Sequence, residues 1–109
     1  MGPTILASGN VQSTFVLTVS LTPTSVTNGT TAEQSFTVAG LAVGDQISSI
    51  NYLGVLSGLV DITNFRVISN NTLGIAFTNN GASPAAYPSG SFYVEVNRPY
   101  PGLAMTAIQ

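Results

Sequence analysis

The chain has 109 residues, and its only charged side chains are those of two arginines and four acidic residues. Histidine, cysteine and lysine are absent, which excludes the commonest general base, thiolate chemistry, disulfide bonds and Schiff-base catalysis. Two arginines cannot form the basic patch that nucleic-acid binding requires. Because 44% of the residues are hydrophobic, the low charge does not indicate disorder. What remains is one small globular domain.

The surface of such a domain must consist largely of Thr, Ser, Asn and Gly. A net charge of −2 is close to zero, whereas proteins that remain soluble alone usually carry more charge. We therefore expect the chain to reside in an assembly. No apolar run approaches the roughly 20 residues of a membrane span, and the first residues lack the basic region of a signal peptide. No membrane, nucleic-acid partner or cofactor is expected.

Residues 1–12 show no clear period and are predicted to form an N-terminal arm. The first predicted strand covers 14–21, where alternate apolar residues share one face and Pro23 prevents continuation. Asn28-Gly29 predicts a turn. A second strand follows over 33–40.

The third predicted strand, 46–55, has an imperfect pattern, because Ile47 and Ile50 fall on opposite faces unless a bulge intervenes. The clearest hairpin covers 65–77, with Asn70-Asn71 between its arms. Asparagine tolerates the positive φ that a two-residue type I′ turn requires. With the turn placed there, one face of the hairpin carries Phe65, Val67, Leu73, Ile75 and Phe77.

Residues 79–90 are rich in Gly, Pro and Asn and are predicted to form a loop. The last predicted strand covers 91–97 and ends before Pro99. Six or seven short strands with regular turn signals predict an all-β fold, a small antiparallel β-sandwich. The predicted organisation is an arm over 1–12, a sandwich domain over 13–98 and a C-terminal arm over 99–109.

The candidate catalytic groups are four carboxylates, since two carboxylates that face one sugar suffice for glycoside hydrolysis. Their positions in turns, at a strand start and on an outward face instead favour solvated or turn-capping roles. Calcium binding by Asp45 or Asp61 lacks the spacing of a calcium loop. No serine or threonine has a histidine or lysine to activate it. We therefore expect no enzyme activity and no metal site. The four carboxylates are Glu33, Asp45, Asp61 and Glu95.

Exposed aromatic side chains are the other functional candidates. Four tyrosines could form a platform for stacking on sugars or a protein contact, and packing beneath loops or against neighbouring strands is the alternative. These are Tyr52, Tyr87, Tyr93 and Tyr100.

Four segments together resemble a family of short virion proteins of tailed bacteriophages. They are 30–41 followed by Gly44-Asp45, then 65–67, 71–79 and 88–96. The resemblance spans roughly residues 14–98 and implies a β-sandwich on the outside of a phage particle. It implies a capsid cement or decoration protein that binds the major capsid protein, commonly as a homotrimer.

The two arms fall outside the resemblance and carry no charge. We expect their larger side chains to anchor the protein to coat subunits or to sister copies, and deletion of 99–109 to abolish capsid binding while the domain stays folded. The alternative is a carbohydrate- or receptor-binding module of a phage fibre, neck or tail that uses exposed tyrosines and the 79–90 loop. The predicted anchors are Ile5, Leu6, Tyr100, Leu103, Met105 and Ile108.

Overall fold

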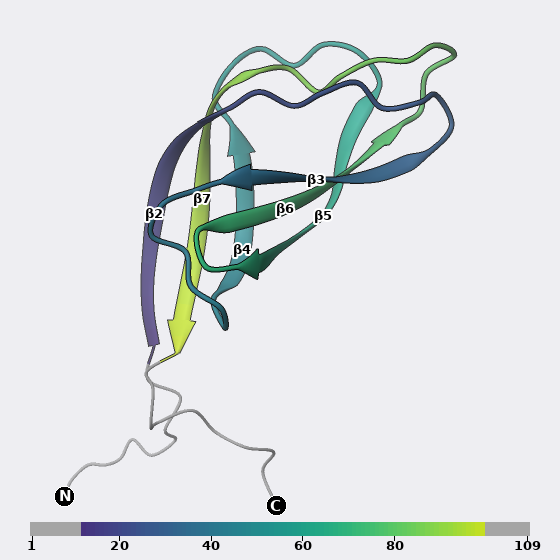
Figure 1. The fold of residues 1–109 in the computed structure, drawn as a ribbon. Helices are drawn as coiled ribbons and strands as arrows, with labels where there is room; N and C mark the ends of the chain where they lie inside the picture. The colour runs from purple at the N-terminus through teal and green to yellow at the C-terminus, as the bar shows by residue number, and fades with distance from the viewer. Residues whose placement is uncertain (1–11, 100–109) are drawn as a thin grey trace, which may run out of the picture.

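The computed structural model describes residues 12–99, which form two three-stranded antiparallel sheets. One sheet has the order β2-β7-β4 and the other the order β3-β6-β5. This arrangement confirms the predicted all-β sandwich (Figure 1). The strands are β2 (Gln12–Leu21), β3 (Thr31–Thr37), β4 (Gln46–Tyr52), β5 (Val60–Ser69), β6 (Thr72–Asn79) and β7 (Gly90–Pro99).

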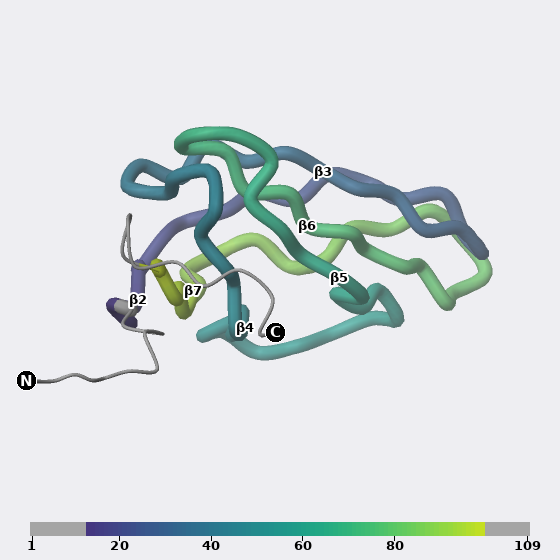
Figure 2. Tube along the Cα trace, turned by 90° about the horizontal axis from the view of Figure 1, so that it is seen from below, coloured from purple at the N-terminus to yellow at the C-terminus, as the bar shows by residue number. Residues whose placement is uncertain are grey.

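The two sheets form separate layers whose strands cross steeply (Figure 1). In the view turned by 90°, the β3-β6-β5 layer extends well beyond the β2-β7-β4 layer (Figure 2). The overhanging part is covered by connections instead of by strands. One of these, around Val26, forms an isolated β-bridge to Ala85.

The first sheet is built around β7. β2 pairs with β7 from Gln12↔Pro99 to Leu21↔Gly90 without a register shift. β4 pairs with the other side of β7, and its register shifts between Ile47 and Ser49. Because of this bulge, Ile47 and Ile50 both pack against the core. The bulge accounts for the imperfect alternation of the third predicted strand.

The predicted hairpin forms the centre of the second sheet. Leu73, Ile75 and Phe77 of β6 have no exposed surface, and Phe65 and Val67 of β5 pack beside them. β5 is longer than predicted: it begins at Val60, whereas the hairpin was predicted to begin at residue 65. The shared apolar face of the hairpin is confirmed.

The turn of this hairpin lies at Asn70-Asn71 as predicted, but its predicted type is wrong. A type I′ turn needs positive φ at both central residues, and only Asn71 has it, at 62°. Tertiary contacts determine this geometry. The Asn71 N–H donates to the Leu41 carbonyl at 2.9 Å, and its side-chain oxygen accepts from Gly40 N–H at 3.0 Å. The Asn70 side chain accepts from Val43 N–H at 2.9 Å, so the turn is docked on the β3–β4 connection.

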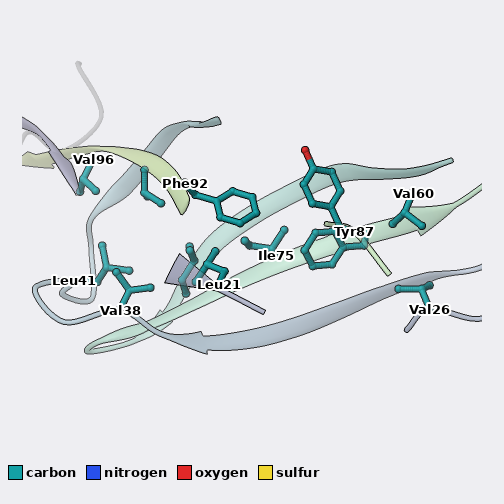
Figure 3. Close-up of a cluster of buried hydrophobic side chains, with 12 residues drawn as sticks. Leu21, Val26, Val38, Leu41, Val60, Ile75, Tyr87, Phe92 and Val96 are labelled. Atoms are coloured by element: carbon teal, nitrogen blue, oxygen red, sulfur yellow. The ribbon is translucent and has the colours of Figure 1, made fainter. Parts of the chain in front are cut away.

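The core lies between the layers (Figure 3). Tyr52, Phe77, Tyr87 and Phe92 form an aromatic group, with ring centroids 5.0–5.9 Å apart in each contacting pair. Beyond this group, the core continues beneath the overhanging sheet. The buried apolar residues are Leu21, Val26, Val38, Leu41, Val60, Leu73, Ile75, Phe77, Tyr87, Phe92, Val94 and Val96.

Candidate functional site

The predicted arm anchors lie outside the described residues. The structure describes where the arms begin: Gln12 and Pro99 are paired at the end of the first sheet. The two ends of the described chain therefore lie side by side, at the end of the sandwich opposite the β4–β5 connection. The six predicted anchors that lie outside the described residues are Ile5, Leu6, Tyr100, Leu103, Met105 and Ile108.

The four carboxylates are dispersed, and each one accepts a hydrogen bond from a neighbouring side chain. Arg66 donates to Glu33, Arg98 to Asp45, Asn80 to Asp61 and Ser49 to Glu95, over 2.7–3.3 Å. In the part of the chain that the structure covers, no group of three or more acidic residues could hold a metal ion.

Asp45 lies at the end of the sandwich where Gln12 and Pro99 are paired. Its side chain is 2% exposed, and Arg98 donates to both of its oxygens at 2.8 and 2.7 Å. The hydrogen bond from Arg98 lowers the pKa of Asp45; burial opposes this, and the Ala42 N–H adds to it. Arg98 also donates to the Gly40 carbonyl and lies over the Phe15 ring, 5.0 Å from its centroid. Asp45 caps its own turn, as predicted, but it is buried rather than solvated.

The tyrosines do not form a common platform. Tyr87 is buried in the core, as the alternative of packing beneath a loop predicts. Tyr52 packs on Tyr87 and donates its hydroxyl to the Ser89 carbonyl at 3.0 Å. The Tyr87 ring is buried because it packs against Phe77, on the inner face of the second sheet. Tyr93 is 45% exposed on the outer face of β7, and Tyr100 lies outside the described residues.

The connection from β4 to β5 is the most apolar exposed segment of the described chain. In this segment, 53–59, Leu53 is 46% exposed, Val55 87%, Leu56 65% and Leu59 61%. It carries no charged residue. Because exposed apolar clusters are typical of interaction sites, this segment is a candidate for one. The sequence signal was an uncharged apolar run. We assigned its first residues, 53–55, to the third predicted strand, which in the structure ends at Tyr52, and the following residues to a connection.

A cavity of about 340 Å³ lies beneath this apolar connection. Its volume is at the lower end of the range for small-molecule sites. Burial raises the pKa of the Tyr87 hydroxyl, and the negative charge of Asp61 contributes to the same shift. The cavity is lined by Ile50, Leu56, Ser57, Gly58, Val60, Asp61, Ile62 and Tyr87.

The outer faces of both sheets are rich in hydroxyl groups and carry few charges. These are Glu33, Arg66 and Asp61 on the second sheet and Glu95 on the first. On the second sheet, Thr31 and Thr78 hydroxyls are 2.6 Å apart, and Thr78 donates to Thr63 at 3.3 Å. On the first sheet, Tyr93 lies between Thr18 and Asn51 in the strand register. These faces can form many hydrogen bonds but offer little charge.

Comparisons of the chain with protein-family models, with curated proteins and with solved structures give no match. Within residues 12–99, no helix is long and apolar enough to cross a membrane. The functional argument therefore depends on the geometry and surface chemistry described above.

Proposed function

We propose that the protein is a non-enzymatic structural protein of a bacteriophage virion, a capsid cement or decoration protein that binds the major capsid protein on the outer surface of the head. On the shell it binds as a homotrimer, as the resemblance to phage virion proteins implies. Its described carboxylates are engaged in structural hydrogen bonds, and its sheet faces are rich in hydroxyl groups and carry few charges. These features suit a protein whose function is contact.

The observation that carries this proposal is the exposed apolar connection 53–59. It lies at one end of the sandwich, and the paired Gln12 and Pro99, where the arms begin, lie at the other. The protein thus offers two separate apolar attachments, one at each end. A protein attached at both ends can bridge adjacent coat subunits. Specific interfaces bury about 1,600 Å² in total, and an arm together with a loop offers contact on that scale.

The function needs no bond chemistry. A cement protein that binds the expanded shell but not a dissociated or collapsed one stabilises the shell by mass action. At a free concentration of about 100 times the Kd, such binding contributes about 2.7 kcal/mol per site. Summed over a shell, this effect resists heat and internal pressure.

The first experiment is to measure the amount of this chain relative to major capsid protein in gradient-purified virions. A ratio near one supports a protein that covers the head. A few copies per particle indicate a fibre, neck or tail component instead. Absence of the chain from virions contradicts the proposal.

A second experiment tests the attachment sites on shells stripped of the protein. Val55→Ser with Leu59→Ser should weaken binding at least tenfold, and deletion of 99–109 should abolish it. Val16→Ser is the control, because Val16 is 54% exposed in the middle of β2, away from both ends of the sandwich. Equal binding by the Val55/Leu59 variant and the control would exclude the apolar connection as an attachment.

The alternative function is that of a carbohydrate- or receptor-binding module of a fibre, neck or tail. One observation favours it: the Tyr93 ring is exposed on a face of hydroxyl and amide groups, where a sugar could stack. The burial of Tyr87 removes one of the aromatic groups that this reading requires. Binding of the protein to host-surface glycans, and the loss of this binding in the Tyr93→Ala variant, would support the alternative.

A further inference from the structure

Each sheet has two edge strands, and an edge strand presents N–H and C=O groups that can pair with another chain. Three of the four edges carry features that discourage such pairing. β4 is bulged between Ile47 and Ser49, and β5 has two register shifts and contains both an acid and an arginine. β3 contains Glu33, and its Gln34 side chain forms hydrogen bonds with the backbone of Thr24 at 2.8 Å.

The fourth edge, β2, has none of these features. Its ten residues, QSTFVLTVSL, include no charge and no proline. It pairs with β7 over its whole length without a bulge. In the described part of the chain, only β7 forms backbone hydrogen bonds with β2. β2 is the outermost strand of its sheet in both views (Figures 1 and 2).

The side chains of β2 are also incompletely covered. Phe15, Leu17 and Val19 point toward the core but are only partly buried, whereas Val94 and Val96 of the adjacent β7 have no exposed surface. On the outer face of β2, Val16 is 54% exposed. A further strand beside β2 would cover the open flank of the core and satisfy the outward N–H and C=O groups at once.

We propose that β2 pairs antiparallel with β2 of a second copy, across a two-fold axis at Leu17, to form one continuous six-stranded sheet. The occupant is a second copy because β2 is complementary to itself in this register. Antiparallel pairing about Leu17 uses the whole stretch from Ser13 to Leu21. Residues equally distant from Leu17 lie opposite each other and on the same face.

The central pairs in this register are chemically matched, and only the terminal pair, Ser13 with Leu21, joins a polar residue to an apolar one. On the core side, Phe15 lies opposite Val19 of the second copy, and the two Leu17 side chains meet on the axis. On the outer side, Val16 lies opposite Thr18 of the second copy. Aromatic and β-branched cross-strand pairs stabilise a sheet, and no like charges are opposed. A one-residue slip would place core-facing residues beside outward-facing ones, so the alternation selects even shifts only.

The two-fold contact does not depend on the proposed function, because it concerns the purified protein. It is also compatible with a three-fold assembly on a shell, where it would join copies that belong to adjacent trimers. A cyclic trimer of β2 edges is a different geometry, because an antiparallel strand pair relates two copies only.

Charge placement on the outer face tests the contact. In Val16→Lys/Thr18→Lys, the introduced ammonium groups face each other across the axis, and dimer affinity should fall at least tenfold in sedimentation experiments. In the matched variant Val16→Lys/Thr18→Glu, each ammonium group faces a carboxylate, and affinity should return to within a few-fold of the unmodified chain. Lysine is placed at 16 because Glu95 lies beside Val16 on β7. Thermal melts verify that both variants are folded.

Cysteine pairing tests the register, since the chain has no cysteine of its own. A mixture of Val16→Cys and Thr18→Cys chains should oxidise rapidly to a disulfide-linked heterodimer. Each variant alone should cross-link at least tenfold more slowly, because its own thiols are two residues out of register. A chain that is monomeric at all concentrations, self-association unaffected by the lysine pair, or equal cross-linking in mixed and single samples would overturn the proposal.

Discussion

Glu33 on β3 and Arg66 on β5 form a bidentate ion pair above Gly74 of β6, the strand between them. Arg66 donates through Nε to Oε2 at 2.8 Å and through Nη2 to Oε1 at 2.9 Å. The register places Arg66 beside Gly74, and a Cβ at Gly74 would lie 2.6 Å from Glu33 Oε2. The absence of a side chain at position 74 therefore lets the ion pair cross the central strand.

Gly74→Ala is expected to displace the Glu33 carboxylate from Arg66. The hydrogen bond from Arg66 is the main cause that lowers the pKa of Glu33, so this pKa should rise toward its ordinary value. An NMR titration of the Glu33 side chain measures the change. In Arg66→Gln, the pKa should rise similarly, and adding Gly74→Ala to that variant should raise it little further. An unchanged Glu33 pKa in Gly74→Ala would contradict the steric role of Gly74.

Asn79 and Asn80 are adjacent but should differ strongly in their effect on stability. Asn79 is 1% exposed, donates to the Val26 and Ser83 carbonyls at 2.9 Å, and accepts from Gly81 N–H at 2.8 Å. Asn79→Ala removes these three hydrogen bonds from a largely buried site, although the Val26 carbonyl still accepts from Ala85 N–H, and should cost about 2–3 kcal/mol of unfolding free energy.

Asn80→Ala is the matched control for Asn79→Ala. The Asn80 side chain is exposed and donates only to Asp61, at 2.9 Å. Its loss should cost less than about 1 kcal/mol, because surface substitutions have small effects. Urea denaturation of both variants measures the difference, and equal costs would show that the buried network around Asn79 does not stabilise the fold.

Tyr87 is expected to stabilise the fold through the packing of its ring and not through its hydroxyl. Its ring packs at 5.6 Å from Phe77 and 5.9 Å from Phe92, between ring centroids. Tyr87→Ala should therefore cost about 3–5 kcal/mol, as for other buried aromatic truncations. Tyr87→Phe should lie within about 0.5 kcal/mol of the unmodified chain at neutral pH. A large loss in Tyr87→Phe would show that the hydroxyl has a structural partner.

Comparison of Tyr87→Phe with the unmodified chain also tests how stability falls at alkaline pH. Burial, with a smaller contribution from the charge of Asp61, raises the pKa of Tyr87 in the folded state. The unfolded chain ionises first, near pH 10, so stability present below about pH 10 is lost as the pH rises through the folded-state pKa. Tyr87→Phe should lose less stability between pH 9 and about 11. Identical alkaline profiles would contradict the raised pKa.

The acid limit should depend on Asp45. Arg98 lowers the pKa of Asp45 in the folded state, so the ionised carboxylate stabilises the fold above about pH 4 and the contribution is lost as the pH falls further. Asp45→Asn should cost roughly 2 kcal/mol at pH 7, and the difference from the unmodified chain should shrink in acid. Asp61→Asn, at an exposed carboxylate, should change stability less. A pH-independent cost of Asp45→Asn would exclude the ion pair as its cause.

The strands were largely predictable because their signal is local. Alternating apolar residues identified β2, β6, β7 and the shared face of Leu73, Ile75 and Phe77, and the broken pattern at Ile47 and Ile50 indicated a bulge that the structure contains. The predicted type of the Asn70-Asn71 turn was wrong, because contacts with the β3–β4 connection determine its geometry.

The sites were less predictable. For Tyr87, in a loop between prolines, the sequence left exposure and packing beneath the loop both open, and the structure shows that it is buried. The pairing of Asp45 with Arg98 joins residues 53 positions apart, and no local pattern indicates such a pair. The sequence shows that residues 53–59 are apolar and uncharged, but only the structure shows that their side chains are exposed.

The sequence by itself determined the all-β class, the dearth of charge and the faces of the strands, because side-chain alternation and residue chemistry are properties of neighbouring positions. Only the tertiary structure decided which strands lie at the edges, which polar groups meet and which tyrosine remains exposed. These depend on how the two sheets cross and overhang, which is set by packing between residues far apart in the chain. The unprotected edge of β2 is such a property, since its exposure follows from the strand order and not from its residues alone.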